Sequence, residues 1–351
     1  MARLTLLGPC AFVKSSCVVV LGIGLCLSGW GRESFGGEKI GFSESAFAEE
    51  SDDSCAPVDW SDCDDCCDPW ITARAGALAM HRSSNESHAI LWEQATGRPL
   101  LSTTDVNPDW AAGAEVDLWL RLTHDWEVEL DWFTLGNWSR DYSRDLGGVV
   151  SLPLGAPLTS ADAQSSSELN NYELNLRYRM HDRISLLGGF RYLELNDNFG
   201  VQYSDRVSGL GQTAAIAEVN RLYGFQIGAQ AAIVQAGPWQ LDGWVKAGIF
   251  GNQAHSSVDV AFTGFPVVLP SLRAQSSDAA FVGDLGLRAS RRFGHHWQVY
   301  GGYRVMLLDG VALTSHQIEA VGNFFNTGVA SVDTNATPFY HGAELGAIFS
   351  F

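Results

Sequence analysis

The residues from 339 to 351 alternate in character with a period of two, and this pattern limits the possible folds more than any other feature. One set of positions is mostly apolar, comprising Phe339, His341, Ala343, Leu345, Ala347, Phe349 and Phe351. The intervening set is mostly small or polar, comprising Tyr340, Gly342, Glu344, Gly346, Ile348 and Ser350. Successive side chains of a strand point to opposite faces, so the stretch is predicted to be a β-strand with one apolar face.

The same alternation recurs along the chain and predicts ten strands, at 70–81, 109–122, 126–139, 168–180, 184–196, 220–234, 238–253, 279–293, 297–309 and 339–351. Short turns follow every second strand, at 123–125, 181–183, 235–237 and 294–296. Long polar stretches separate the resulting pairs, at 82–108, 140–167, 198–218, 254–278 and 310–338. Regular alternation of short and long connections is typical of transmembrane β-barrels.

Strands of this length can cross a bilayer when they are tilted. Lipid offers no hydrogen-bond partner to a free sheet edge, so the first strand must pair with the last. We therefore predict an all-β fold, a closed antiparallel transmembrane β-barrel over residues 70–351. Ten strands are expected, with eight or twelve as alternatives, and with short periplasmic turns and long outer loops.

Composition and charge agree with a barrel in lipid. The chain has 351 residues, among them 37 glycines and 12 tryptophans. Aromatic side chains in this abundance are typical of the belts at membrane surfaces. A mean hydropathy of -0.01 argues against a helical membrane protein. A net charge of -18 disfavours nucleic acid as a partner. The expected partners are outer-membrane lipid and small solutes.

Residues 1–48 have the pattern of an export signal. Arg3 and Lys14 are basic, residues 18–27 are apolar, and Ala46-Phe47-Ala48 offers a small-x-small cleavage site. An earlier cut and a transmembrane anchor are the alternatives. Export, together with the barrel pattern, predicts the outer membrane of a Gram-negative cell envelope, with both chain termini in the periplasm.

Residues 49–69 form an acidic segment without periodicity, which is predicted to be a periplasmic extension. It contains four cysteines, Cys55, Cys63, Cys66 and Cys67. An even number of cysteines in an exported chain favours disulfides. The spacing of Cys63 and Cys66, with aspartates around them, keeps a zinc site open as the alternative. No metal or cofactor is otherwise predicted.

Aromatic residues lie at the predicted ends of the strands. Those next to the short turns or the chain ends should form a periplasmic belt, because an indole is apolar but carries an N–H that needs a partner. They are Trp70, Trp126, Trp239, Trp297 and Phe351. The outer belt is predicted to contain Trp110, Trp138, Tyr172, Tyr192 and Phe339.

The polar sets of the strands should point into the barrel. The acids predicted there are Glu115, Asp117, Glu127, Glu129, Asp131, Glu173, Asp242, Asp284 and Glu344. The bases predicted there are Arg74, Arg121, Arg177, Arg179, Arg191, Arg221, Lys246, Arg288 and Arg304. Unpaired buried charges are costly, so these groups should pair with one another. A ten-stranded barrel is narrow, and we expect a salt-bridged lumen with a narrow polar path at most.

Three strand motifs, at 188–195, 220–228 and 301–310, resemble those of the planctomycete-type outer-membrane β-barrel family. They are similar, more loosely, to those of Legionella-type pore-forming major outer-membrane proteins. The C-terminal strand ending in Phe351 resembles the closing strand of bacterial outer-membrane barrels, whose end is recognised by the barrel assembly machinery. The resemblance covers roughly 70–351 and implies an outer-membrane barrel, with pore formation among the roles of its relatives.

The predicted function is therefore structural or surface-related, or that of a narrow channel. One alternative is an adhesin that acts through the long outer loops. Another is an outer-membrane enzyme, a rim protease or lipase, because acids and histidines fall near the predicted rim: His81, Asp197, Asp309, His316 and His341. No motif unites these residues, and no Ser–His pairing has a recognisable spacing. We predict that the protein is not an enzyme.

Overall fold

The computed structural model describes residues 69–83, 88–93, 96–107, 110–151, 157–264, 271–318 and 331–351. The predicted export signal and the four cysteines of the acidic extension, Cys55, Cys63, Cys66 and Cys67, lie outside these residues. Within the described ranges, no helix has the length and apolar character that a membrane crossing requires.

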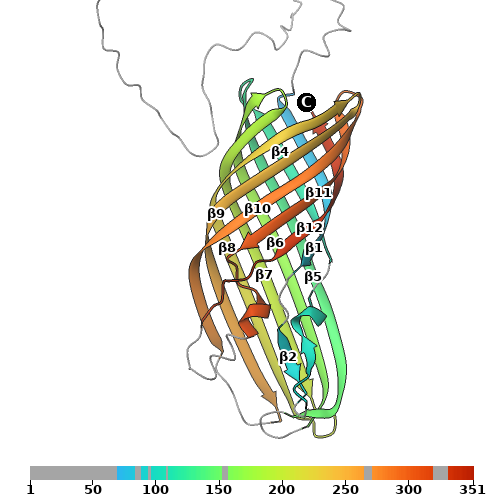
Figure 1. Ribbon diagram of the computed structural model, residues 1–351, viewed down its shortest axis with the longest axis vertical. Coiled ribbons are helices and arrows are strands. Elements are labelled where there is room, and N and C mark those ends of the chain that lie inside the picture. The colour runs from blue at the N-terminus through green and yellow to red at the C-terminus, as the bar shows by residue number, and fades with distance from the viewer. Residues whose placement is uncertain are drawn as a thin grey trace, which may run out of the picture. The chain divides into compact units, whose positions relative to one another are not determined.

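Ten antiparallel strands close into a ring, seen in Figure 1. They are β1 Ile71–Ser83, β4 Trp110–Arg121, β5 Trp126–Ser151, β6 Pro157–His181, β7 Ile184–Ser204, β8 Gly211–Ala236, β9 Trp239–Thr263, β10 Leu272–Phe293, β11 Trp297–Asp309 and β12 Phe339–Ser350. The first strand pairs with β4 on one side and with β12 on the other: Gly76 is opposite both Glu115 and Gly346. The all-β antiparallel fold is confirmed, and the free edges of the sheet are paired with each other as expected.

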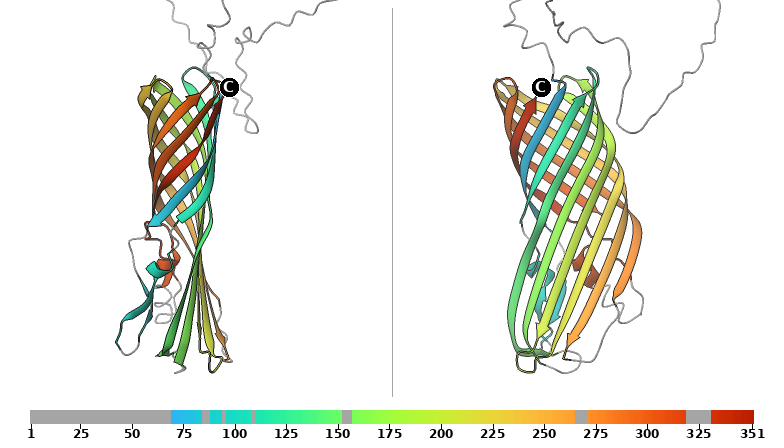
Figure 2. Two further views of the ribbon diagram at one scale, coloured as in Figure 1. Left: turned by 90° about the vertical axis from the view of Figure 1, so that its right-hand side faces the viewer. Right: turned by 180° about the vertical axis from the view of Figure 1, so that it is seen from behind.

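The strands fall into two length classes. β5 to β10 contain 26, 25, 21, 26, 25 and 22 residues. β1, β4, β11 and β12 contain only 13, 12, 13 and 12. The four short strands are neighbours in the ring. The six long strands therefore continue beyond the ends of the short ones along one side of the barrel only, as Figure 2 shows. The prediction of loops at 140–167, 198–218 and 254–278 is therefore wrong for most of their length, because these residues extend the strands.

We call this continuation of β5–β10 the lobe, which is at the bottom in Figure 1, and the closed part of the sheet the ring region. The concave face of the lobe is covered by segments that connect the short strands. One is the hairpin of β2 (Ala89–Trp92) and β3 (Pro99–Ser102), followed by the 3-10 turn η2 (Thr103–Asp105). The other contains a helical turn at 314–318. Side chains of both segments pack on the long strands, so the connections fill the side that the short strands leave open.

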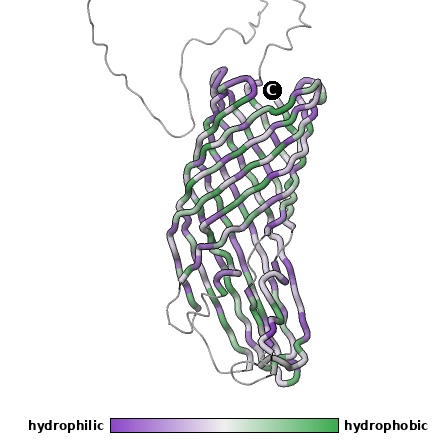
Figure 3. The backbone as a smooth tube through the Cα atoms, in the orientation of Figure 1, coloured by the Kyte–Doolittle hydropathy of each residue, from purple (hydrophilic) through white to green (hydrophobic). Residues whose placement is uncertain are grey.

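The ring region carries apolar side chains outside and polar ones inside. Phe225 on β8 is 76% exposed, whereas its neighbour Gln226 is buried in the interior. The same alternation shows as changing colour along each strand in Figure 3. In the lobe the arrangement is reversed, because the buried positions there include Ala163, Val201 and Ile216. The apolar exterior therefore ends at about the level of Tyr192 on β7, beyond which the outward positions are Glu194 and Asn196.

Aromatic residues mark both limits of this apolar band. The set predicted near the short turns is exposed there: Trp70, Trp126, Trp239, Trp297 and Phe351. Trp70 and Phe351 contact each other edge to face, with ring centroids 6.3 Å apart.

At the other limit, Trp110 and Tyr172 are exposed as predicted, but the prediction for Trp138 is wrong. Trp138 is 6% exposed and packs against the ring of Tyr340. A register shift between Leu135 and Trp138 breaks the alternation of β5 and turns this side chain inward.

Candidate lumen charge network

Contacts across the ring show which charged side chains share the interior. Arg191 on β7 lies 3.6 Å from Asp284 on β10, and Lys246 on β9 lies 3.2 Å from Glu129 on β5. These strands are not neighbours in the sheet, so the side chains meet through the lumen. The predicted residues on inward positions are Arg74, Glu115, Asp117, Arg121, Glu127, Glu129, Asp131, Glu173, Arg177, Arg179, Arg191, Asp242, Lys246, Asp284, Arg288, Arg304 and Glu344. We call this set the lumen charge network.

Arg221 was predicted to belong to this set, and that prediction is wrong. On β8 the inward positions are Asn220 and Leu222, so the side chain between them points outward. The Arg221 side chain is 50% exposed and pairs with Glu194 of β7 at 3.4 Å. Arg221 is one residue away from an inward position on its strand, and a shift of one residue moves a side chain to the opposite face.

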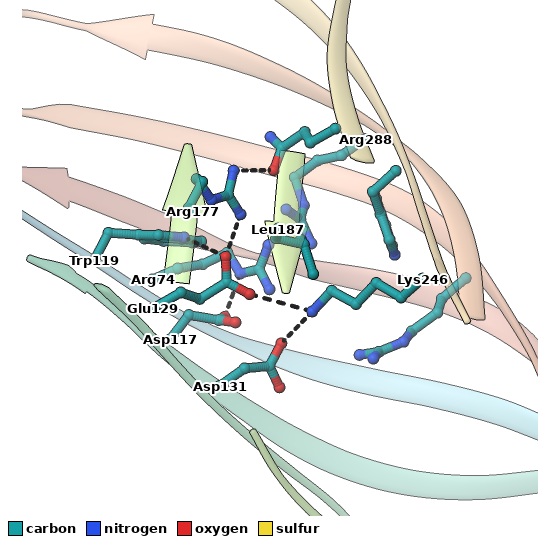
Figure 4. A pocket seen from close by; sticks show the side chains of 12 residues that line it. Arg74, Asp117, Trp119, Glu129, Asp131, Arg177, Leu187, Lys246 and Arg288 are labelled. Atoms are coloured by element: carbon teal, nitrogen blue, oxygen red, sulfur yellow. Dashed lines mark hydrogen bonds and ion pairs between the residues drawn. The ribbon is translucent and has the colours of Figure 1, made fainter. Parts of the chain in front are cut away.

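Lys246 lies at the centre of the network, where three carboxylates converge on its ammonium group. Figure 4 shows two of them, Glu129 and Asp131. The Nζ atom is 2.7 Å from Glu173, 3.2 Å from Glu129 and 3.5 Å from Asp131. Oxygens of these acids lie within 4.8 Å of one another, which is close enough for a metal ion. The ammonium group occupies that place itself and supplies the positive charge that the acids require.

The remaining ions form further pairs around this centre. Arg74 donates to Asp117 at 2.5 Å, and Arg288 donates to Glu344 at 2.6 Å. Arg304 pairs with Asp284, which also faces Arg191. Charged groups removed from water are stable only where such hydrogen bonds replace hydration, so this network fixes the side chains in one arrangement.

Aromatic rings separate the cations of the network. Arg74 stacks between Trp119 and Tyr300, with its guanidinium carbon 5.3 Å and 5.6 Å from the two ring centroids. Arg288 stacks between Trp244 and Tyr300 at 4.7 Å and 4.9 Å. An aromatic face attracts a cation, and more strongly where water is excluded. The sequence prediction omitted these rings, although each occupies an inward position next to the charged ones.

Neutral amides complete the network and were also missed. The Nε2 atom of Gln226 donates to Glu173 at 2.6 Å, and the Nδ2 atom of Asn175 donates to Glu129 at 3.0 Å. Arg191 donates to the amide oxygen of Asn171 at 2.6 Å. Only their positions in the alternation, on the inward face of each strand, could have identified them, because amides are equally common on exposed strand faces.

Little space remains among these side chains. The cavity lined by Trp119, Glu129, Arg177 and Lys246 measures about 20 Å³, room for about one water molecule. At the short-turn end the lumen widens into an open mouth of about 230 Å³, lined by residues such as Trp70, Arg121 and Gln240. At the lobe end the apolar cluster that contains Phe133, Leu222 and Met306 follows directly. Two filled layers, one ionic and one apolar, therefore occupy the lumen.

Two carboxylates face the interior of the lobe, beyond the apolar exterior band. Burial would raise the pKa of Asp197, but the guanidinium of Arg82 at 2.7 Å and the hydroxyl of Thr314 hold it below its ordinary value. Glu218 has no cation beside it among the described residues. Burial raises the pKa of Glu218 to about 8, partly offset by a hydrogen bond that Ser256 donates.

The five residues considered for a rim enzyme do not assemble into one site in the described part of the chain. Asp197 is buried inside the lobe, whereas His81 and His341 lie on the outward faces of β1 and β12. Asp309 accepts a hydrogen bond from Thr337 at 2.7 Å. The ring of His316 packs near that of His88, with centroids 5.5 Å apart.

A ten-stranded antiparallel ring with apolar residues outside and a matched ionic network inside defines a β-barrel of porin-like architecture. The sequence agrees with this class. Residues 155–348 match the model of the family described as Putative beta barrel porin-7 (BBP7), and the chain belongs to that family. The resemblance to an outer-membrane β-barrel family that the strand motifs indicated is confirmed.

Solved structures with a similar arrangement share little sequence with the chain. The outer-membrane protease OmpT of Escherichia coli has a TM-score of 0.47 and 11% identity, over 80% of this chain and 96% of that one. The translocator domain of the autotransporter NalP of Neisseria meningitidis has a TM-score of 0.39 and 11% identity, over 83% of this chain and 92% of that one. The toluene transporter TbuX of Ralstonia pickettii has a TM-score of 0.35 and 9% identity, over 81% of this chain and 90% of that one. No curated protein matches the chain.

Proposed function

We propose that the protein is a structural outer-membrane β-barrel whose ring region crosses the lipid and whose lobe stands in water on the outer side. Two observations support the crossing. Exposed apolar side chains such as Leu174, Phe225 and Ile249 cover the ring region, and exposed aromatic residues lie at the limits of this band. Such a surface is stable in hydrocarbon and unfavourable in water.

The filled lumen is the observation that favours a structural role over an open channel. Lys246 reaches acids on β5 and β6 from β9, and the space left beside it is about 20 Å³. A permanent pore for solutes would need a continuous water-filled path, whereas this level of the barrel holds about one water molecule. A solute entering the mouth at the short-turn end would meet the paired ions of the network.

Planar bilayer recording of the purified full chain tests this proposal. Folded protein, recognised by its altered gel migration before boiling, is expected to give no stable conductance steps. Lys246→Ala combined with Arg191→Ala removes two cations that bridge the lumen, and is expected to leak if it inserts. Regular steps from the unaltered protein would contradict a sealed barrel and favour the narrow channel.

A separate experiment tests on which side of the membrane the lobe lies. Gln164 lies on the outward face of the lobe, and His295 lies in the turn between β10 and β11. Gln164→Cys should react with a membrane-impermeant maleimide on intact cells, whereas His295→Cys should react only after the cells are permeabilised. The unaltered protein serves as the background for its natural cysteines. The reverse labelling pattern would place the lobe in the periplasm.

A second candidate is attachment to an external surface through the lobe. The observation that favours it is a groove of about 530 Å³ on the outward face of the lobe, lined by residues that include Ala217, His255 and Arg273. Cells that display the protein should then bind a host or matrix surface, and His255→Ala with Arg273→Ala should reduce this binding without altering the amount of displayed barrel. Unchanged binding would remove this candidate.

A further inference from the structure

Two histidines face each other across the seam where the barrel closes. His81 on β1 and His341 on β12 are register partners, so their side chains project from the same outward face of adjacent strands. Their ring centroids are 5.3 Å apart and the ring planes are inclined by 45°. Trp110 and Phe339 flank the pair, which places it at the limit of the apolar band that faces away from the short turns.

A hydrogen bond can orient one histidine of the pair as a metal ligand. The Nδ1 atom of His341 is 2.6 Å from the hydroxyl oxygen of Tyr303 on β11. When this nitrogen donates its proton to Tyr303, the lone pair of the ring lies on Nε2. A ligating histidine is commonly oriented by such a hydrogen bond from its other nitrogen. The Nδ1 atom of His81 is buried and has no hydrogen-bond partner among the described residues.

The separation of the rings matches two ligands of one tetrahedral ion. A zinc–nitrogen bond of about 2.0–2.1 Å places the metal about 3.2 Å from the centroid of the imidazole ring. Two such rings at a tetrahedral angle have centroids about 5.2 Å apart. The observed 5.3 Å is close to this value.

We propose that His81 and His341 bind one divalent transition-metal ion, of the zinc or copper class, across the β1–β12 seam. Imidazole suits these ions, whereas calcium and magnesium prefer oxygen ligands. Water completes the coordination from the adjacent aqueous side. Tyr303 is a positioning residue that holds His341 in the ligating tautomer. The bound ion joins the first strand to the last and so holds the barrel closed.

Titration of the tag-free full chain with zinc chloride tests the site. The protein is folded in detergent, stripped with a chelator and titrated in competition with a chromophoric zinc indicator. We expect one tight site in the unaltered chain. His81→Gln and His341→Gln should each weaken it by more than about 10-fold, and Tyr303→Phe by about 10–100-fold, as for other partners of metal ligands. His124→Gln, which replaces an exposed histidine in the turn between β4 and β5, is the matched control and should not change it.

A spectroscopic readout separates the pair from other histidines. The electron paramagnetic resonance spectrum of the protein with one equivalent of Cu²⁺ should show two coordinated imidazole nitrogens, and one in each single variant. The same measurement remains decisive if a variant folds poorly, because it counts nitrogens in the unaltered protein. Absence of tight binding, binding by either histidine variant as tight as that of the unaltered chain, or a spectrum without two imidazole nitrogens would overturn the site.

Discussion

The lobe continues six of the ten strands of the ring region, and the two regions have opposite chemistry. On β8, Phe225 points outward and Gln226 inward in the ring region, whereas Thr213 points outward and Ile216 inward in the lobe. The alternation continues without interruption, and only the kind of residue on each face changes. The surroundings of each region explain this difference.

In water, burying apolar side chains is favourable, so an apolar interior stabilises the lobe. In lipid the outside is as apolar as the interior could be, and the same burial gains little. Pairing of polar groups is then what can distinguish inside from outside, as in the contacts of Lys246. The two interiors should therefore respond differently to the same type of substitution.

The largest difference is expected for Lys246→Met, which leaves three buried acids without their shared cation. Breaking a buried ion network by removing one partner costs about 3–5 kcal/mol. Urea titration of the protein in phospholipid vesicles measures the free energy of unfolding. Lys246→Arg keeps the charge and should recover part of the loss. A Lys246→Met barrel as stable as the parent would show that the network does not hold the ring region together.

Ile216→Ala examines the other interior. Ile216 is 6% exposed and belongs to the buried apolar cluster of the lobe, where truncating an isoleucine costs about 2–5 kcal/mol through lost burial and the cavity left behind. Ile227→Ala, on the lipid-facing side of the same strand, is the matched control and should cost much less, because lipid fills the space. The same urea titration compares the two. Equal losses would contradict the assignment of different surroundings to the two regions.

Stability of the lobe should fall as the pH rises, through Glu218. Burial raises its pKa to about 8 in the folded protein, whereas an unfolded glutamate titrates near 4.3. The folded lobe therefore binds more protons between these values, and its free energy of unfolding decreases by up to about 1.4 kcal/mol per pH unit. Glu218→Gln should remove this slope and make the lobe more stable than the parent at pH 8.

Hydrogen exchange of the β8 and β9 amides, corrected for the intrinsic pH dependence of exchange, measures this local stability. Asp197→Asn is a contrasting variant, because Arg82 and Thr314 favour its charged form. That variant should lose stability at neutral pH. A Glu218→Gln protein that keeps the parent slope would mean that Glu218 is already ionised in the folded lobe.

The smallest effect is expected for Arg221→Ala. Its ion pair with Glu194 is exposed on the outside of the barrel, and such pairs contribute about 0–1 kcal/mol. The same urea titration should show a change within that range, which sets the scale for the buried pairs. A loss as large as that of Lys246→Met would indicate that Arg221 has a partner in the membrane surface.

Period-two alternation allowed the ten strands, the four short turns and the inward phase of most charged residues to be predicted. The prediction from alternation was wrong where the residue types of the strands changed. Stretches such as 160–167 are rich in serine and alanine and contain few of the β-branched and aromatic residues that mark strands, so the sequence predicts loops there. The prediction for Trp138 was wrong for another reason. A register shift just before this residue turns its side chain from the outer face of the sheet to the inner one.

The partners within the lumen could not be predicted from phase alone. Lys246 meets Glu129, which is 117 residues away along the chain. Which inward groups share one level depends on the tilt and stagger of the closed sheet, and a single strand does not record these. The aromatic rings between the arginines depend on the same stagger.

The unequal strand lengths bear on how the barrel can be assembled. Both terminal strands are short, and every pairing that builds the lobe lies between β5 and β10, in the middle of the chain. The water-exposed sheet can therefore complete its hydrogen bonds while the ends of the chain are still apart. Closure then requires only the twelve residue pairs between β1 and β12. Pulse-labelling hydrogen exchange during folding should show protection of the lobe before that of the seam; simultaneous protection would mean that the two regions form as one unit.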